Sequence, residues 1–438
     1  MLRHCATSLF VIFLALRVAV PAIGADDVPV ALQNYMKRPE PDFAWQITNR
    51  VKSENGRMIE LRLTSQKWQD IVWEHAVEIF EPAKVEYPQH ALLFVTGGSQ
   101  PPRSPGESTL QMGAALAKQS GARVIVLHQV PNQPLFDNRR EDDLITETWL
   151  KYLQTGDETW PLLFPMVKSA VKTMDAVQEL STDEFGQKIE KFVITGASKR
   201  GWTSWLAPVA DSRVVATAPI VIDVLNFRAQ MDHQLKTWGR FSDQIIDYSS
   251  KGLIVTGDES PQEKQLRLMM DPYTYRKQLA LPKLLVNGTN DTYWVCDAMK
   301  WYWPDLSGPK YALQVPNAGH GLDGGRELAL STVAAFTRCV ASGRPLPSLN
   351  WEVAQTGTRV GLDLTSSVAP VAARLWSAHS SDLDFRDERW SASDLARQKD
   401  KYSGSVEKNG KPHVAFYGEL QFAIDDVPYS LCTIIHRN

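Results

Sequence analysis

A serine flanked by small residues, in the segment Gly196-Ala197-Ser198-Lys199-Arg200-Gly201, lies where a strand pattern (191–195) changes into a helix pattern (202–207). A chain that turns this sharply needs glycine or alanine beside the turn to avoid steric clashes. The turn raises the Ser198 hydroxyl above the sheet, and the N-terminus of the following helix favours developing negative charge. The second glycine comes one position later than in the common G-x-S-x-G arrangement. The hexapeptide alone also fits an ordinary turn, so the surrounding chain must decide.

From residue 57 to about residue 342, strand and helix patterns alternate along the chain. Residues 90–96 form a continuous apolar run, as expected of a central strand that is buried on both faces. Further strand patterns lie at 58–64, 73–80, 122–127, 192–195, 214–222, 281–287 and 310–315, with helix patterns at 111–120, 158–180 and 325–340. This alternation predicts an α/β fold with a mostly parallel sheet that is flanked by helices. Residues 224–281, rich in charge, aromatics and methionine, predict a helical cap.

Two candidate partners for Ser198 follow late strand patterns. Asp291 comes after the strand pattern at 281–287 and a small-residue turn, and His320 stands between glycines after the strand pattern at 310–315. Ser, then Asp, then His is the order of catalytic groups in α/β-hydrolases, which is the fold class we predict. His320 would accept the Ser198 proton, and Asp291 would fix the imidazole tautomer. Asp223 is a rival acid on the preceding strand, and Asp297 is a weaker one.

Other residues near these turns are candidates for binding. An oxyanion hole needs two backbone donors, which we assign to the amide of Lys199 and to that of Gly98 or Ser99 in the loop after residue 95. Arg200 either binds an anionic group or forms a salt bridge under the turn. Trp202 and Trp294 either line an apolar or sugar-stacking cleft or pack in the core.

The first 25 residues have the composition of a secretory signal peptide. Arg3 supplies positive charge, residues 6–20 are largely apolar, and Ala22, Gly24 and Ala25 precede Asp26. We therefore predict a cleaved signal at 1–25, a secreted or periplasmic protein and a hydrolase domain at 26–343. An amphipathic or anchoring N-terminus is the alternative. No later stretch reaches the apolar length of a stable membrane span.

The net charge and the cysteine content indicate which ligands and disulfides to expect. The formal net charge of −3 gives no argument for a nucleic-acid partner. We expect no metal and no organic cofactor, because the sequence has neither a C-x-x-C pair nor histidines at metal-ligand spacing. Cys296, Cys339 and Cys432 remain after the signal. The sequence is compatible both with a Cys296–Cys339 disulfide and with buried free thiols.

The sequence changes character after residues 342–347, which predict a linker. Short alternating runs between 351 and 435 predict a β-sandwich-like C-terminal domain at 346–438, with one helix pattern at 393–399. We expect this segment to have its own core and to supply no catalytic group. The alternative is that Trp351 and Trp376 pack against the hydrolase domain as part of one core.

Four segments, 92–100, 196–202, 287–294 and 317–321, resemble the PhoPQ-activated pathogenicity-related protein family. The resemblance extends from about Asp42 to the C-terminus, and Gly-Ala-Ser-Lys-Arg-Gly-Trp is its most specific element. It implies a secreted or periplasmic α/β-hydrolase-like protein whose substrate is unsettled. The turn also resembles that of glucuronoyl esterases, Gly-Cys-Ser-Arg-x-Gly, but Ala197 replaces the cysteine and the arginine comes one place later, so no substrate class is transferred.

These observations predict a secreted serine hydrolase that cleaves an ester or amide through an acyl-enzyme. An esterase is favoured over a peptidase, because the sequence shows no peptide-positioning propeller and no charged specificity pocket. The substrate, a small molecule or a cell-envelope or peptide component, is not defined by the sequence. The alternative is a non-catalytic, virulence-associated extracellular binding protein on a hydrolase scaffold.

Overall fold

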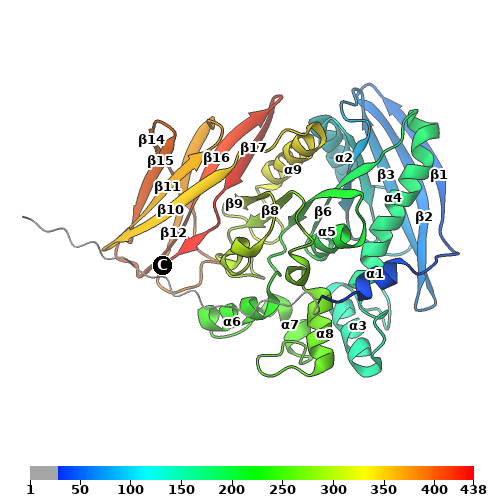
Figure 1. Ribbon diagram of the computed structural model, residues 1–438, viewed down its shortest axis with the longest axis horizontal. Helices are drawn as coiled ribbons and strands as arrows, with labels where there is room; N and C mark the ends of the chain where they lie inside the picture. The colour runs from blue at the N-terminus through cyan, green and yellow to red at the C-terminus, as the bar shows by residue number, and fades with distance from the viewer. Residues whose placement is uncertain (1–27) are drawn as a thin grey trace, which may run out of the picture.

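The computed structural model describes residues 28–438, so the predicted signal peptide lies outside the described residues. Its main feature is a 14-stranded mixed sheet that runs through the whole molecule (Figure 1). Six strands at its centre are parallel, in the order β5-β4-β6-β7-β8-β9. They are β4 (His90–Val95), β5 (Arg123–Leu127), β6 (Lys191–Ala197), β7 (Val214–Ile220), β8 (Lys283–Gly288) and β9 (Lys310–Val315). The antiparallel strands β1 (Ala44–Ser53), β2 (Gly56–Trp68) and β3 (Ile71–Pro82) extend the sheet beyond β5.

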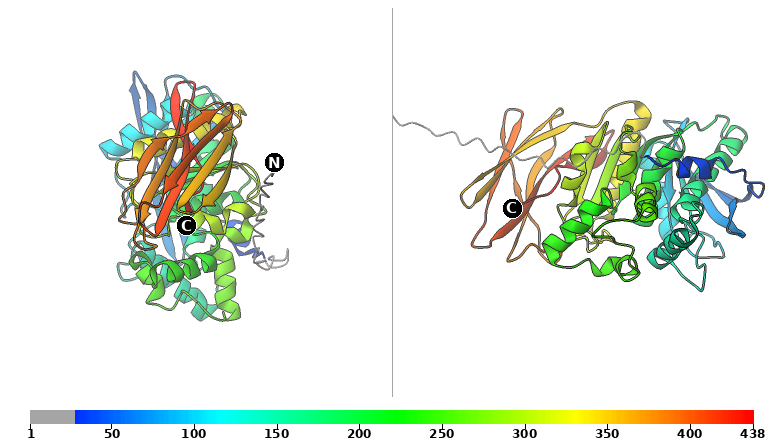
Figure 2. Two further views of the ribbon diagram at one scale, coloured as in Figure 1. Left: turned by 90° about the vertical axis from the view of Figure 1, so that its left-hand side faces the viewer. Right: turned by 60° about the horizontal axis from the view of Figure 1, so that its bottom comes forward.

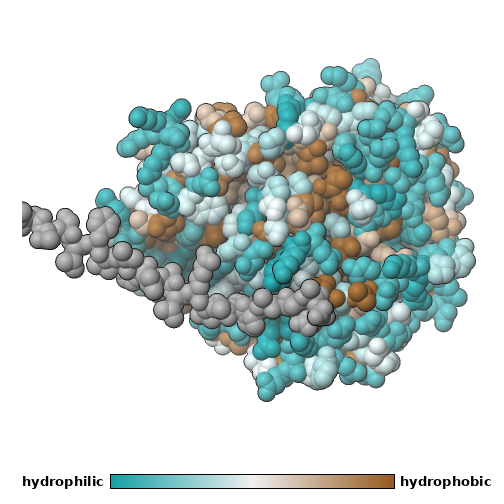
Figure 3. Space-filling model, in the orientation of Figure 1, coloured by the Kyte–Doolittle hydropathy of each residue, from teal (hydrophilic) through white to brown (hydrophobic). Residues whose placement is uncertain are grey.

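Helices cover both faces of this sheet, as the alternating pattern predicted. One face carries α2 (Glu107–Ser120) and α9 (Arg326–Ser342), and the other carries α1 (Ala31–Met36), α4 (Leu163–Phe185) and α5 (Lys199–Ala210). Successive strand side chains point to opposite faces. Accordingly Leu93 belongs to the hydrophobic cluster on one side, and Leu92 belongs to the cluster on the other. Figure 3 shows hydrophobic side chains gathered near the middle of one face, within a largely hydrophilic outline. This arrangement is the α/β-hydrolase fold.

The segment between β7 and β8 forms a small helical cap, which lies at the bottom of Figure 1 beside α3 (Glu141–Thr155). Its α-helices are α6 (Phe227–Trp238), α7 (Ile246–Ser249) and α8 (Pro261–Met270). A capping box, in which Ser260 and Glu263 exchange side-chain and backbone hydrogen bonds, fixes the start of α8. No helix within residues 28–438 is long and apolar enough to cross a membrane.

The C-terminal segment consists of two sheets that pack face to face (Figure 2). One is the 4-stranded antiparallel sheet β10-β11-β15-β14, and the other is formed by β12, β13, β16 and β17, with β18 paired to β16. The strands are β10 (Leu349–Thr356), β11 (Arg359–Ser366), β12 (Ala372–Ser380), β13 (Ser391–Asp394), β14 (Ala396–Gln398), β15 (Lys401–Glu407), β16 (His413–Ile424), β17 (Val427–Cys432) and β18 (His436–Arg437). Leu362 and Leu364 of the first sheet reach Gly418 of the second so closely that a Cβ there would lie 2.9 and 3.0 Å from them. The helix predicted at 393–399 does not form, because β13 pairs with β12 and β14 pairs with β15.

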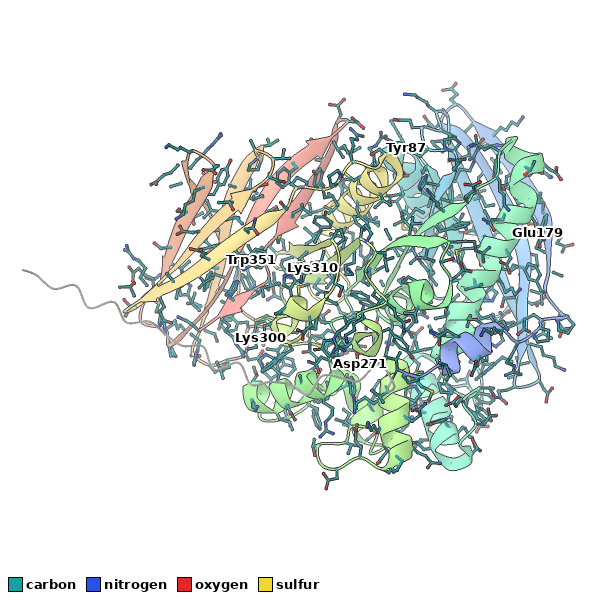
Figure 4. The ribbon with its side chains drawn as sticks, in the orientation of Figure 1. Tyr87, Glu179, Asp271, Lys300, Lys310 and Trp351 are labelled. Atoms are coloured by element: carbon teal, nitrogen blue, oxygen red, sulfur yellow. The ribbon has the colours of Figure 1, made fainter. Side chains whose placement is uncertain are left out.

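The expected separation of this segment from the main sheet is wrong. Strand β17 pairs antiparallel with β9 through Cys432 and Ala312, so the C-terminal strands continue the central sheet. The ring centres of Trp351 in β10 and Trp303 lie 6.3 Å apart. Figure 4 shows Trp351 close to Lys310 of β9 at this junction. One hydrophobic cluster contains side chains from both β9 and β17. Of the two tryptophans named in the alternative, Trp351 packs against the hydrolase region. Trp376 instead stacks on Tyr417 and donates to Glu419, both within the C-terminal segment.

Candidate active site

Ser198 lies at the sharp turn between β6 and α5, with backbone angles φ 58° and ψ −122°. This region is costly for a residue with a side chain, so the surrounding contacts must hold it there. The Ser198 amide donates to the carbonyl of Ile220 at 2.9 Å. A Cβ on Gly201 would lie 2.7 Å from Ile222 Cγ2 and 2.9 Å from Gly196 O. The close approach therefore requires glycine at 201.

His320 connects Ser198 to Asp291. Its Nε2 lies 2.9 Å from Ser198 Oγ, and its Nδ1 lies 2.8 Å from Asp291 Oδ2. An ionised carboxylate can only accept hydrogen bonds, so Nδ1 must be the donor and Nε2 is left to accept the serine proton. The other carboxylate oxygen of Asp291 accepts from the amide of Tyr293 at 2.8 Å. Asp291 is buried, whereas the His320 side chain is 23% exposed.

The loops that carry Asp291 and His320 follow β8 and β9 and touch one another. A Cβ on Gly288 would lie 2.3 Å from the carbonyl oxygen of Ala318, so this approach requires glycine. The amide of Asn290 donates to the same carbonyl at 3.0 Å, and the amide of Asn317 donates to Thr289 Oγ1 at 2.9 Å. The positions of the acid and of the imidazole are therefore set together.

A loop of the C-terminal segment braces both of these loops. Asn290 Nδ2 donates to the carbonyls of Arg386 and Glu388 at 2.9 and 2.8 Å. Asn317 exchanges two hydrogen bonds with the backbone of Trp390, at 3.0 and 2.7 Å. The segment supplies no side chain to the described Ser198 pocket, yet it holds the chain on either side of that pocket's acid and base.

The two rival acids have other partners in the described chain. Asp223 is fully enclosed and accepts a hydrogen bond from Tyr302 Oη, and burial raises its pKa to about 7. Asp297 pairs with His233 at 2.6 Å and with Lys300 at 2.7 Å. Of the three candidate carboxylates, Asp291 is the one that the fold brings to His320.

The loop after β4 lies against the start of α5. A Cβ on Gly97 would lie 2.5 Å from Arg200 Nη2, and Gly98 has a φ of 135°. Within residues 28–438, the amides of Gly98, Ser99 and Lys199 donate no hydrogen bond to the protein. Lys199 lines the Ser198 pocket, whereas Gly98 and Ser99 are not among its lining residues. The Ser99 hydroxyl accepts from Arg140 Nη1 at 2.6 Å.

Successive acids at the start of α3 pair with successive bases at the start of α5. Arg200 binds Glu141 with two hydrogen bonds of 2.7 Å and also donates to the carbonyl of Val130. Burial opposes ionisation of Glu141, but Arg200 outweighs it and lowers the pKa of Glu141 to about 2. Arg200 thus forms the salt bridge under the turn that the sequence left open, and it does not line the described pocket.

Lys199 does line the pocket, with its Nζ 2.6 Å from Asp142 Oδ2. Burial alone would lower the pKa of Lys199, but the Asp142 carboxylate reverses this effect and raises it. Tyr248 Oη also donates to Asp142, at 2.9 Å. Asp142 and Tyr248 were not predicted as site residues, since nothing in the sequence indicates that they meet Lys199.

The space in front of Ser198 is a partly enclosed, mainly apolar pocket with an enclosed volume of about 30 Å³. Trp202 and Trp294 line it and also belong to the buried core, so both alternatives from the sequence hold for these side chains. Tyr293, which the sequence analysis also missed, places its ring 4.1 Å from the His320 ring. Its position two residues after Asp291 was the available signal. Asp142 and Lys199 are the charged pair in the wall, and they neutralise each other.

Two further expectations concern cysteines and metals. Cys296, Cys339 and Cys432 are all free thiols in the structure, so the disulfide alternative is wrong. Burial raises the pKa of the Cys339 thiol to about 11, which makes it a poor nucleophile. No group of three or more His, Cys, Asp or Glu side chains suited to a metal occurs within residues 28–438.

The sequence model of the family described as PhoPQ-activated pathogenicity-related protein matches residues 32–386. This chain belongs to that family. Among curated proteins, Autocrine proliferation repressor protein A of Dictyostelium discoideum is 32% identical over 376 residues, which cover 82% of this chain and 76% of that protein. The family assignment agrees with the resemblance carried by the Gly196–Trp202 segment.

Solved structures similar to this family member include several esterases. Acetyl xylan esterase 1 from Thermoanaerobacterium sp. JW/SL YS485 has a TM-score of 0.48 and 15% identity, covering 70% of this chain and 94% of that chain. An S-formylglutathione hydrolase from Agrobacterium tumefaciens has a TM-score of 0.44 and 13% identity, covering 68% of this chain and 99% of that chain.

Proposed function

We propose that this protein is a serine hydrolase that cleaves esters through an acyl-enzyme. The observation that carries the proposal is the position of His320 between Ser198 Oγ and Asp291 Oδ2, at 2.9 and 2.8 Å. His320 Nε2 accepts the hydroxyl proton as Ser198 Oγ forms a bond to the ester carbonyl carbon. The imidazolium then gives that proton to the leaving alcohol oxygen, and the carbonyl–oxygen bond breaks. Water repeats the sequence in the second half-reaction and releases the acid.

The negative charge on the carbonyl oxygen would be stabilised by backbone donors. We assign these donors to the amide of Lys199 and to that of Gly98 or Ser99, which have no partner within the described chain. Such donors are effective because they are already oriented when the charge develops. The positive end of α5 adds to the same effect.

An ester is favoured over a peptide by the walls of the pocket. Most of the lining is apolar, and the Lys199 and Asp142 charges satisfy each other at 2.6 Å. A peptide would need polar groups that hold its backbone on both sides of the scissile bond. The pocket wall instead suits a neutral group that is bound by contact with aromatic side chains.

A fluorophosphonate probe tests the proposal, with a second serine as its control. Ser65 Oγ also lies 2.9 Å from a histidine nitrogen, His75 Nε2. That pair is fully buried, its other ring nitrogen faces the carbonyl of His128, and burial lowers the pKa of His75 to about 4. We expect labelling of the wild type and of Ser65→Ala, and none of Ser198→Ala. Equal labelling of Ser198→Ala and wild type would exclude Ser198 as the nucleophile.

The alternative function is ligand binding without chemistry, and the name of the amoebal relative describes a growth effect and not a reaction. A folded wild-type protein that neither reacts with the probe nor turns over any ester would favour this alternative. We also propose export. Mature protein from the exporting cell should begin at Ala25 or Asp26, and N-terminal sequencing that still finds Arg17 in exported material would contradict this.

A further inference from the structure

A second cavity lies beside the Ser198 pocket, between the cap helices and α3. Its enclosed volume is about 40 Å³, and it is open to solvent on one side. Its apolar walls include Trp149, Leu153, Met231, Leu253, Leu266 and Met270. Neither the catalytic steps nor the oxyanion donors described above use this space.

The two cavities share a wall made of Trp202, Val224 and Phe227. Trp202 is fixed, because its Nε1 donates to the carbonyl of Met270 at 2.6 Å. The backbone amide of Phe227 donates to Asp271 at 2.8 Å, and Figure 4 shows Asp271 where the cap meets the body of the molecule. The Phe227 side chain is only half-buried, and it is the first residue of α6. Phe227 is therefore the least buried of the three side chains that separate the two spaces.

The charged groups around the second cavity already have partners. Glu259 binds Arg267 at 2.6 Å and Arg228 at 3.3 Å. Glu263 accepts from the amide of Ser260 at 2.7 Å, and Asp271 accepts from backbone amides that include Tyr273 at 2.9 Å. A ligand in this cavity would therefore gain nothing from carrying a charge, whereas apolar groups would be removed from water against apolar walls.

We propose that this cavity binds the acyl chain of the ester substrate, so that the protein prefers esters of longer aliphatic acids to acetyl esters. This inference rests on the proposed function. The leaving alcohol must lie beside His320, because His320 protonates it. Tyr293 packs on the His320 ring, with the two ring centres 4.1 Å apart. The acyl group would then lie against the opposite wall, which is formed by Trp202, Val224 and Phe227. The second cavity lies behind this shared wall.

The test compares kcat/KM for p-nitrophenyl octanoate and p-nitrophenyl acetate. Each methylene that becomes buried contributes about fourfold to binding, so a partly buried chain should favour octanoate by roughly a hundredfold. Leu253→Trp places a large side chain in the cavity from a loop and should reduce the octanoate-to-acetate ratio at least about tenfold. Ile246→Trp is the matched control, because Ile246 belongs to the cap, is 57% exposed and lines neither cavity. It should leave the ratio unchanged.

A second measurement does not depend on the folding of any variant. A crystal structure of the wild-type protein inactivated with a long-chain alkyl fluorophosphonate should show the chain past Phe227 among the cap residues. A chain that runs out to solvent, or equal kcat/KM for the two esters, would overturn the inference while the proposed function stands. Hydrolysis of neither ester together with no labelling of Ser198 would instead count against the proposed function itself.

Discussion

Replacing Asn290 by alanine should reduce turnover, although Asn290 touches no substrate. Its side-chain amide donates to the carbonyls of Arg386 and Glu388, and its oxygen accepts from Thr289 Oγ1 at 2.7 Å. The next residue is Asp291, whose carboxylate holds His320. The substitution therefore removes the bond between the C-terminal segment and the loop of the acid.

The size of the effect follows from these contacts. A hydrogen bond between neutral groups contributes about 1 kcal/mol. Asn290 Nδ2 lies within bonding distance of three carbonyls, and Oδ1 accepts from Thr289, so their loss should lower the free energy of unfolding by about 2–3 kcal/mol. Asn290 is half-buried, so water can replace part of this loss. A displacement of a catalytic group by about 1 Å can cost about 100-fold in rate. We expect kcat to fall roughly 10- to 100-fold while KM changes little.

Two assays separate positioning from general stability. Urea unfolding gives the free energy, and ester turnover per fluorophosphonate-reactive site gives kcat for folded protein alone. Gln178→Ala is a matched control, because Gln178 Nε2 donates to the carbonyl of Ile189 at 2.9 Å and its Oε1 accepts from Arg213 at 2.8 Å, near the start of β6. It should lose similar stability and keep its kcat. If Asn290→Ala loses stability and its kcat stays within twofold of the wild type, the bracing role of Asn290 is refuted.

Three further outcomes follow from the structure. Asp291→Asn should lower kcat by about 10⁴ through the wrong imidazole tautomer, whereas Asp223→Asn should lower it less than about tenfold; the reverse order of the two kcat values would reassign the acid. Burial raises the pKa of Asp223 from 3.8 to about 7, so the folded protein holds a proton that the unfolded chain lacks between these values. Stability should therefore fall by about 4 kcal/mol as pH rises through that window, and urea unfolding of Asp223→Asn at pH 5 and pH 8 should lack this slope. Truncation after Gly343 should give aggregated, probe-inactive protein, because it uncovers the apolar surface that β17 covers; soluble, reactive protein would show that the two parts fold independently.

The parts of the fold that the sequence predicts are those set by local patterns. The continuous apolar run of β4 and the small residues around Ser198 each need only neighbouring residues to be recognised. Asp291 and His320 could be found for the same reason, since each follows a strand and a turn with glycine. The order of Ser198, Asp291 and His320 along the chain then predicted that the three side chains act together.

The parts that the sequence did not predict depend on contacts between distant segments. Helix α3 had no strong periodic pattern, yet Glu141 and Asp142 at its start pair with Arg200 and Lys199. The pairing of Cys432 with Ala312 likewise depends on the free edge of β9 in the folded sheet. No local sequence pattern indicates which strand will pair with that edge. The 393–399 segment reads as a helix in isolation, but pairing with adjacent strands overrides that preference.

The two additions to the α/β core also contact each other. Arg437, next to the C-terminus, lies 3.4 Å from Asp297 and donates to Thr237 of α6 at 3.1 Å, while Asp297 also binds His233 of α6. The C-terminal segment therefore anchors the helix whose first residue is Phe227. The same segment braces the loops of Asp291 and His320. Since it holds both the wall of the pocket and the proposed catalytic groups, the geometry in front of Ser198 depends on the whole described chain and not on the α/β core alone.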